Sequence, residues 1–210
     1  MKLRRRTFIV ALAGTAASAG CTGAADQPRD DRPTETQTPT PTEDPKADTP
    51  AERFADEPCP SFTETDRTVC WHTREDGDIS LEPSADVLRV GDGDDTVETV
   101  TFTLHNDADR PFKLNPHAWA VKEKADGEWT HVAPDAYVQP LNEVPPGETY
   151  EWVLSREQHS SPMAERTLAV TADVTPGLHA FAVHGWYGDG DDAEDVECIA
   201  LFEVEDIVTE

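Results

Sequence analysis

Short runs of alternating apolar and polar residues fill the chain from about residue 57 to its end. The clearest run places Val100, Phe102 and Leu104 between threonines, a period of two that is typical of a strand with one buried face. Glycine, proline and aspartate separate the runs, and no window of 12 residues carries a 3.6-residue apolar period. The pattern predicts an all-β domain over 57–210, a sandwich of seven to nine short strands in two packed sheets.

One hairpin is predicted in detail. Asp126-Gly127 is a strong two-residue turn signal between two apolar arms. Trp119 and Val121 on the first arm are expected to face the same side as Trp129 on the second arm. We therefore assign Trp129 to the sandwich core, together with Trp119 and Trp152.

The N-terminal part of the chain has a different pattern. Residues 1–20 combine a basic start with an apolar run from Phe8 to Ala19, which is too short to span a membrane and fits a signal peptide. Residues 21–56 are rich in threonine, proline and acids, and Phe54 is their only large apolar side chain. Such a segment cannot bury enough surface to offset its ordering entropy, so it is predicted to be a disordered tether.

Two motifs in residues 1–21 resemble export signals. Arg5-Arg6-Thr7-Phe8-Ile9 resembles the twin-arginine signal, in which Arg5, Arg6 and Phe8 mark a protein that folds before export. Ser18-Ala19-Gly20-Cys21 resembles the lipobox of lipoproteins, whose cysteine receives a lipid and becomes the new N-terminus. The resemblance implies an extracellular lipoprotein, held by membrane lipid through Cys21 on the outer face of the cell membrane.

The charge of the chain is strongly acidic. Its 43 acidic and 17 basic residues give a formal net charge of −26. Acids spread along every segment in this way resemble the surfaces of proteins from salt-loving archaea, where a screening length of about 3 Å at molar salt suppresses their repulsion. A nucleic-acid partner is disfavoured, because neutralising phosphates requires a basic patch.

Turn and core motifs over about 96–205 resemble the immunoglobulin-like surface modules of bacterial and other extracellular lipoproteins. In chain order they are Thr101-Phe102-Thr103-Leu104-His105-Asn106-Asp107, Trp119, Lys124-Ala125-Asp126-Gly127-Glu128-Trp129, Pro145-Pro146-Gly147-Glu148-Thr149-Tyr150, and Leu178-His179 after Pro176-Gly177. The resemblance implies an immunoglobulin-like β-sandwich with an adhesive or structural role.

Three cysteines follow Cys21. A disulfide is expected outside the cytoplasm, and three thiols leave one over. Cys59–Cys70 would close a short loop and is the favoured pairing, with Cys198 a buried free thiol. Cys70–Cys198, which would join the first and last strands, is the alternative.

A metal-binding or redox domain is a rival hypothesis. Soft ligands are offered by Cys70-Trp71-His72, His179, His184 and Cys198. Cupredoxins are sandwiches with such ligands, but they need a closely spaced Cys, His and Met that does not follow Cys198 here. The acidic runs 92–95 and 189–192 offer carboxylates for calcium without completing a loop template. We therefore expect no cofactor.

Ligand contact is assigned to Trp186 and Tyr187, which lie between two glycines in an expected loop. Aromatic side chains on a β-face can form a platform for a sugar or a peptide, so a carbohydrate-binding module is a second rival hypothesis.

Catalysis is not expected. Ser155, Ser160 and Ser161 lie near His159, but no Gly-x-Ser-x-Gly elbow surrounds them. The sequence thus predicts a non-enzymatic surface interaction or envelope-associated module. Its expected partners are membrane lipid and a cell-surface protein or glycan.

Overall fold

Eleven β-strands and two single-turn 3-10 helices make up the part of the chain that the computed structural model describes, residues 53–73, 77–91, 99–157 and 164–206. The elements are β1 (Arg67–Cys70), η1 (Trp71–Thr73), β2 (Ile79–Pro83), β3 (Val87–Val90), β4 (Thr99–Asn106), β5 (Phe112–Ala125), β6 (Glu128–Ala133), β7 (Asn142–Val144), β8 (Thr149–Ser155), β9 (Thr167–Thr171), β10 (Gly177–Tyr187), η2 (Gly190–Asp192) and β11 (Glu194–Asp206). The export and lipidation residues Arg5, Arg6, Phe8 and Cys21 lie outside the described residues.

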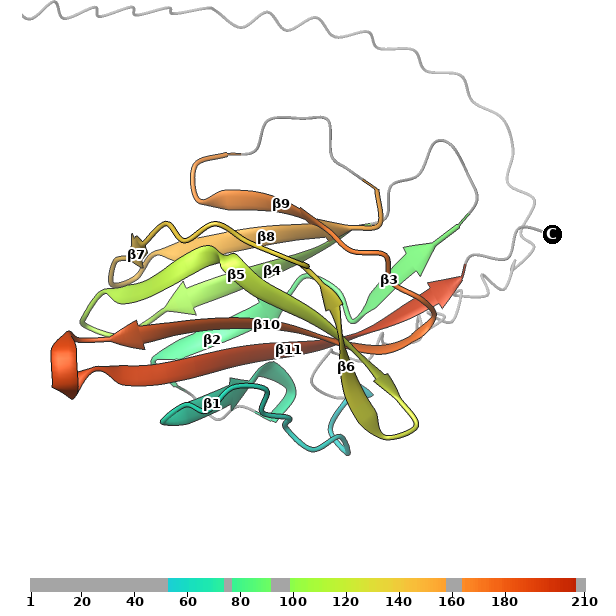
Figure 1. Ribbon diagram of the computed structural model, residues 1–210, viewed down its shortest axis with the longest axis horizontal. Helices are drawn as coiled ribbons and strands as arrows, with labels where there is room; N and C mark the ends of the chain where they lie inside the picture. Colours follow the sequence, from blue (N-terminus) through green and yellow to red (C-terminus); the bar gives the residue numbers. More distant parts are fainter. Residues whose placement is uncertain (1–52, 74–76, 92–98, 158–163, 207–210) are drawn as a thin grey trace, which may run out of the picture. The chain divides into compact units, whose positions relative to one another are not determined.

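The strands form two sheets (Figure 1). The larger sheet has the order β1-β11-β10-β5-β6, with β3 paired to β11 and β7 paired to β5, and the smaller sheet has the order β2-β4-β8-β9. The predicted β-sandwich is confirmed, although the described residues hold eleven strands and not seven to nine. Short strands explain the difference: β7 has three residues, of which only Val144 is buried, and it leaves no period-two signal.

The main core lies between the sheets. β4 alternates half-buried threonines with fully buried Val100, Phe102 and Leu104, as its period of two predicts. Phe102 of the smaller sheet stacks on Phe181 of the larger sheet, with ring centroids 4.2 Å apart. Trp152 is fully buried, and its indole Nε1 donates a 2.8 Å hydrogen bond to the carbonyl oxygen of Pro116. Both sheets thus contribute aromatic side chains to one core.

A second apolar cluster lies on the outer face of the larger sheet. Its buried members are Phe54, Cys70, Ala180, Ala182, Ile199 and Leu201. Residues 53–66, which we name the strap, contribute Phe54 to this cluster and Phe62 to its edge. Because the strap covers the sheet, β10 is buried on both faces from His179 to Val183.

The folded part therefore begins before the expected boundary at residue 57. Phe54 is only 5% exposed, and the guanidinium of Arg53 lies 2.7 Å from a carboxylate oxygen of Asp86. Phe54, the large apolar side chain of the segment predicted to be disordered, therefore packs on the sheet.

The predicted hairpin turn is present, with positive φ angles of 54° at Asp126 and 86° at Gly127. The predicted placement of Trp129 is wrong. The two-residue turn pairs Ala125 with Glu128 and Lys124 with Trp129, and Trp129 packs against the outer cluster, whereas Trp119 lies in the main core. Side chains alternate along a strand, so Trp129 shares the face of Lys124, which is opposite to the face of Trp119 and Val121.

Candidate functional site

The loop between β6 and β7 carries an unusual group of apolar side chains. Tyr137, Val138 and Leu141 are 53%, 63% and 59% exposed, and they are the strongly exposed large hydrophobic residues of the described part of the chain. Isolated apolar residues are common on protein surfaces, but a contiguous exposed patch marks an interaction site. We name residues 137–141 the apolar loop.

Hydrogen bonds fix the apolar loop to β5. The Asn115 amide Nδ2 donates to the carbonyl oxygen of Val138 at 2.8 Å, and the Asn115 Oδ1 accepts from the backbone N–H of His117 at 3.0 Å. At the start of the connection, a ring nitrogen of His131 lies 2.9 Å from the carbonyl oxygen of Pro134. The connection is therefore held before the loop at Pro134, within it at Val138, and directly after it by the pairing of Asn142 with Leu114, so its apolar side chains are presented from a defined backbone.

An irregularity in β5 creates the space beneath the loop. Trp119 pairs with Val183 and Leu114 with Gly185, so the four residues 115–118 of β5 lie opposite His184 alone. Extra residues in one strand bend it locally, and such bulges are frequent beside functional sites. Here the bulge displaces the stretch of β5 that carries Asn115 and Ala118.

A pocket of about 300 Å³ lies between the bulge and the apolar loop. It is lined by Asn115, Ala118, Tyr137, Gln139, Pro140, Leu141 and Trp186. Its volume is at the lower end of the range of small-molecule sites. None of these described lining residues is charged, although the chain as a whole has a net charge of −26.

The two residues assigned to ligand contact have different surroundings. Trp186 is partly exposed and lines the pocket. Tyr187 is fully buried in the main core, where its hydroxyl donates to Asn106 Oδ1 at 3.0 Å and burial raises its pKa. The expectation of a loop at this position is wrong, because both residues end β10, and Tyr187 faces away from any surface ligand.

Gly185 explains why the loop was expected. A Cβ at this position would lie 2.4 Å from the carbonyl oxygen of Lys113 and 2.5 Å from the ring of Phe112. The glycine therefore allows close approach of β5 to β10 and does not end the strand. It keeps Trp186 on a rigid strand at the edge of the pocket.

A smaller hollow of about 140 Å³ adjoins the first pocket, and both are lined by Ala118. The remaining residues of this hollow are Phe62, Thr63, Ala120, Lys122, Ala182, Val183, His184 and Glu197. We name the two hollows together the outer-face groove. Small alanine side chains line the bottom of this groove, which runs from the apolar loop to the strap.

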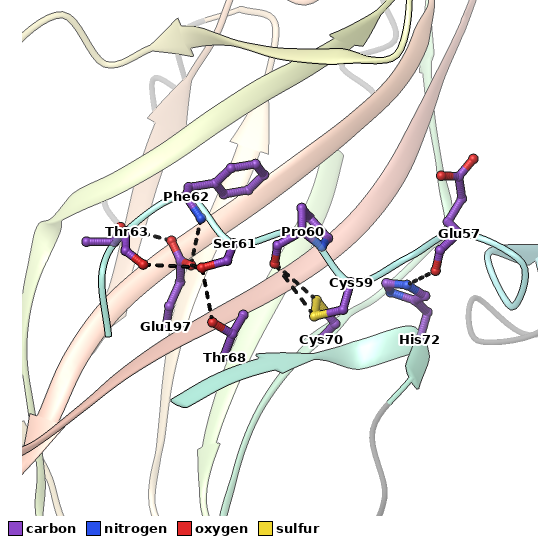
Figure 2. The surroundings of a disulfide bond; sticks show 10 residues. All are labelled: Glu57, Cys59, Pro60, Ser61, Phe62, Thr63, Thr68, Cys70, His72 and Glu197. Atoms are coloured by element: carbon purple, nitrogen blue, oxygen red, sulfur yellow. Dashed lines mark hydrogen bonds between the residues drawn. A yellow bond between two sulfur atoms is a disulfide. The ribbon is translucent and has the colours of Figure 1, made fainter. Parts of the chain in front are cut away.

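The strap is fastened at the far end of the groove (Figure 2). Cys59 and Cys70 form a disulfide, with Cα atoms 5.7 Å apart, which is the pairing favoured from the sequence. Glu197, 2% exposed on β11, accepts hydrogen bonds from the Phe62 backbone N–H at 2.9 Å and the Thr63 hydroxyl at 3.0 Å. One buried carboxylate thus binds consecutive residues of the strap.

The residues considered as metal ligands do not assemble. Cys70 is held in the disulfide, and a ring nitrogen of His72 lies 3.0 Å from the carbonyl oxygen of Glu57. Cys198 is a buried free thiol, and burial raises its pKa to about 12, so it stays protonated at neutral pH. Within the described ranges, no three His, Cys, Asp or Glu side chains lie close enough to hold a metal ion.

The remaining candidate residues have structural surroundings or fall outside the structure. Asp189 pairs with the ammonium of Lys113. The Ser155 side chain is fully buried and donates to the carbonyl oxygen of Glu157. The acidic run 92–95 and the segment 159–161 lie outside the described residues. No helix in the described part of the chain is long and apolar enough to cross a membrane.

Comparison with known proteins assigns no family. No family model matches the sequence, and no curated protein matches it. Among solved structures, the structural-genomics target SoR45 is 18% identical over 60% of this chain and 84% of its own, with a TM-score of 0.31.

In two further solved structures, the match spans a small part of a larger protein. The DNA glycosylase AlkC of Pseudomonas fluorescens, bound to DNA with an abasic-site analogue, is 17% identical over 62% of this chain and 31% of its own, with a TM-score of 0.30. A β-glucosidase of Listeria innocua in complex with gluconolactone is 16% identical over 60% of this chain and 16% of its own, with a TM-score of 0.24. These scores are too low to inform the function of this chain.

Sequence reasoning identified Trp186 and missed the residues that surround it. Tyr137 and Leu141 lie in a stretch without any apolar period, between Pro134 and the short β7, so the pattern predicts no element there. A usable signal was present: the run Tyr137-Val138-Gln139-Pro140-Leu141 lacks charge in a chain that is 29% charged. Apolar side chains in a surface connection are not buried in the core, so such an uncharged run indicates an exposed apolar patch.

Proposed function

We propose that this protein is a lipid-anchored, extracellular, non-enzymatic interaction module that binds a cell-surface or envelope ligand in the outer-face groove. The observation that carries the proposal is the position of the exposed apolar side chains. Tyr137 and Leu141, which are more than half exposed, line one pocket together with Trp186. Aromatic side chains at the centre of a site supply much of the energy of recognition.

The anchor and the site support the same role. The motif at Cys21 resembles a lipobox, and the acidic composition suits an exterior at high salt. Lipid attachment holds a protein at the membrane surface, where its binding site can bind neighbouring envelope components. An immunoglobulin-like sandwich would act as the rigid carrier of that site.

Two substitutions test the proposal. Cys21→Ser in the full chain should release the protein from the membrane into the medium, as cell fractionation would show. The released protein then serves as a soluble probe for isolated envelopes, and adding Trp186→Ala should weaken its binding at least about tenfold, a loss of about 1.4 kcal/mol. Retention of the Cys21→Ser protein in the membrane would contradict the anchor, and equal envelope binding by the two probes would contradict the site.

A further inference from the structure

We infer that the ligand of the outer-face groove is a neutral glycan chain, with one sugar ring seated against Trp186 and Tyr137. This inference rests on the proposed function, because it names the chemistry of the ligand for the same groove. It follows from the lining of the pocket, its charge and its continuation toward the strap.

The aromatic side chains supply the stacking surface. Trp186 and Tyr137 line the same pocket, from β10 and the apolar loop respectively. A sugar ring has a face of C–H groups that packs on an aromatic ring, while the indole N–H and the phenol O–H donate to hydroxyls at its edge. Both aromatics start from backbones that are already fixed, which reduces the entropy lost on binding.

Two amides supply the polar contacts. Asn115 and Gln139 line the pocket together with the aromatics. A side-chain amide both donates and accepts, so it matches a sugar hydroxyl, which also does both. The bond from the Asn115 amide to the carbonyl oxygen of Val138 fixes the orientation of this amide in the pocket wall.

The charge of the lining selects against ionic ligands. The pocket is lined without a charged side chain among the described residues, and the chain around it is acidic. A sulfated, uronic or phosphorylated sugar ring at Trp186 would find no cation in this pocket and would lose hydration of its charge without a partner, whereas in the adjoining hollow Lys122 lies beside Glu197. A neutral ring avoids this penalty, and its affinity does not depend on the screening of charges.

The shape of the groove favours a chain over a single sugar. The pocket of about 300 Å³ continues across Ala118 into the hollow of about 140 Å³ beside the strap. Ala118, Ala120 and Ala182 keep the floor low along this path. Units beyond the first would therefore lie over the alanines and extend toward Lys122 and the strap.

A protein ligand is the competing occupant, and Val138 separates the two. Its side chain is 63% exposed but does not line the pocket. A protein that docks on the apolar loop would bury Val138 with Tyr137 and Leu141. A sugar in the pocket would leave it in solvent, so Val138→Ser is a matched control for Trp186→Ala.

The decisive experiment uses the released full-chain Cys21→Ser protein and isolated envelopes in concentrated salt. Envelopes are used untreated or after mild periodate oxidation, which cleaves the C–C bond between vicinal hydroxyls of sugars as iodate forms, with borohydride then reducing the resulting aldehydes. We expect periodate to abolish binding. Trp186→Ala and Tyr137→Ala should each weaken binding at least about tenfold, and Val138→Ser should change it less than about twofold. Circular dichroism and thermal unfolding check that each variant is folded.

Competition then tests the neutrality and length of the ligand. Cellohexaose, maltohexaose and mannohexaose serve as neutral probes, their monosaccharides as short probes, and hexagalacturonate as the charged probe. A neutral hexasaccharide should compete better than its monosaccharide, with no loss of affinity between about 0.5 M and 3 M salt, where the screening length is already short.

The outcomes separate the two proposals. Binding that survives periodate, or that Val138→Ser and Trp186→Ala weaken equally, means a protein ligand: the glycan inference fails and the interaction function stands. Competition by hexagalacturonate alone, or by no oligosaccharide, also overturns the neutral-glycan inference. Envelopes that bind none of the proteins overturn the proposed function and the inference together.

Discussion

The outer face of β10 changes character along its length. Near its middle, Ala180 is fully buried in the outer cluster, with Ile199 and Leu201 of β11 in the same cluster. Near its end, Trp186 is partly exposed and faces the pocket under the apolar loop. The outer face of this strand thus has two regions: the strap covers the first, and the second is open to solvent.

The strap and the apolar loop differ in how they are attached to the larger sheet. The strap is fastened by a covalent bond, a buried carboxylate and an apolar cluster, so the covered end belongs to the stability of the domain. The apolar loop is bound through the carbonyl oxygen of Val138, which accepts from Asn115, while Tyr137, Val138 and Leu141 are more than half exposed. We therefore expect substitutions at the two ends to affect different properties: stability at the strap and binding at the loop.

The largest effect on stability is expected from Cys59→Ala. The disulfide joins residues 11 apart in the sequence, and a closed loop of this size contributes about 2–3 kcal/mol in the chain-entropy model. Chemical denaturation at constant salt measures the change, and envelope binding should persist. A reductant should destabilise the native protein and leave the variant unchanged; a loss below about 0.5 kcal/mol would show that the strap holds without its covalent bond.

Glu197→Gln is expected to cost about 1.5–3 kcal/mol. The carboxylate is 2% exposed and accepts bonds from Phe62 and Thr63, and bonds to a charged acceptor are stronger than neutral ones. Glu205→Gln on the same strand is the control, because the Glu205 side chain is 44% exposed and lies 3.8 Å from Arg53, and surface ion pairs contribute little to stability. Equal free energies of unfolding for the two variants would contradict the role of Glu197 as the fastening of the strap.

Acidification should destabilise the domain through His179 and His72. Burial lowers the pKa of both imidazoles below their ordinary value of 6.5, so the unfolded chain binds protons more readily than the folded one. Stability should hold above about pH 6.5 and fall as the pH drops below it. Denaturation between about pH 7.5 and pH 5 measures the slope, which His179→Leu should reduce; an unchanged slope in that variant would assign the effect elsewhere.

The smallest effect on stability is expected from Trp186→Ala. Its side chain is partly exposed and packs at the edge of an open pocket, so the free energy of unfolding should change by less than about 1 kcal/mol. Envelope binding should nevertheless fall at least about tenfold. A large loss of stability would place Trp186 with the strap as a structural residue and remove the distinction between the two ends.

The strands were predictable where one face alone is buried. β4 shows the alternation plainly, and the turn at Asp126-Gly127 places its hairpin correctly. The burial of β10 on both faces from His179 to Val183 was not predictable, because the strap covers its second face. That second burial depends on a segment more than a hundred residues away, which no local pattern reports.

The site was only partly predictable for a related reason. Trp186 was identified as a partly exposed aromatic residue. Gly185 was interpreted as part of a loop, whereas in the structure it lies in a strand and allows the close approach of Phe112. The apolar loop meets Trp186 through the bulge at 115–118, and the length of a bulge is set by the packing of both strands. Which connection lies over which strand end is a property of the tertiary structure.

The disulfide also determines how the domain bears tension. A force that pulls the chain outward at Arg53 can peel away only residues 53–58, about 20 Å of extended chain, before the load reaches Cys59 and passes through the covalent bond to Cys70. Cys70 ends β1, which pairs with β11 in parallel, so a pull along β1 loads its hydrogen bonds in shear and not one after another. A domain attached through its N-terminal side can thus resist drag from a captured ligand while its groove stays intact.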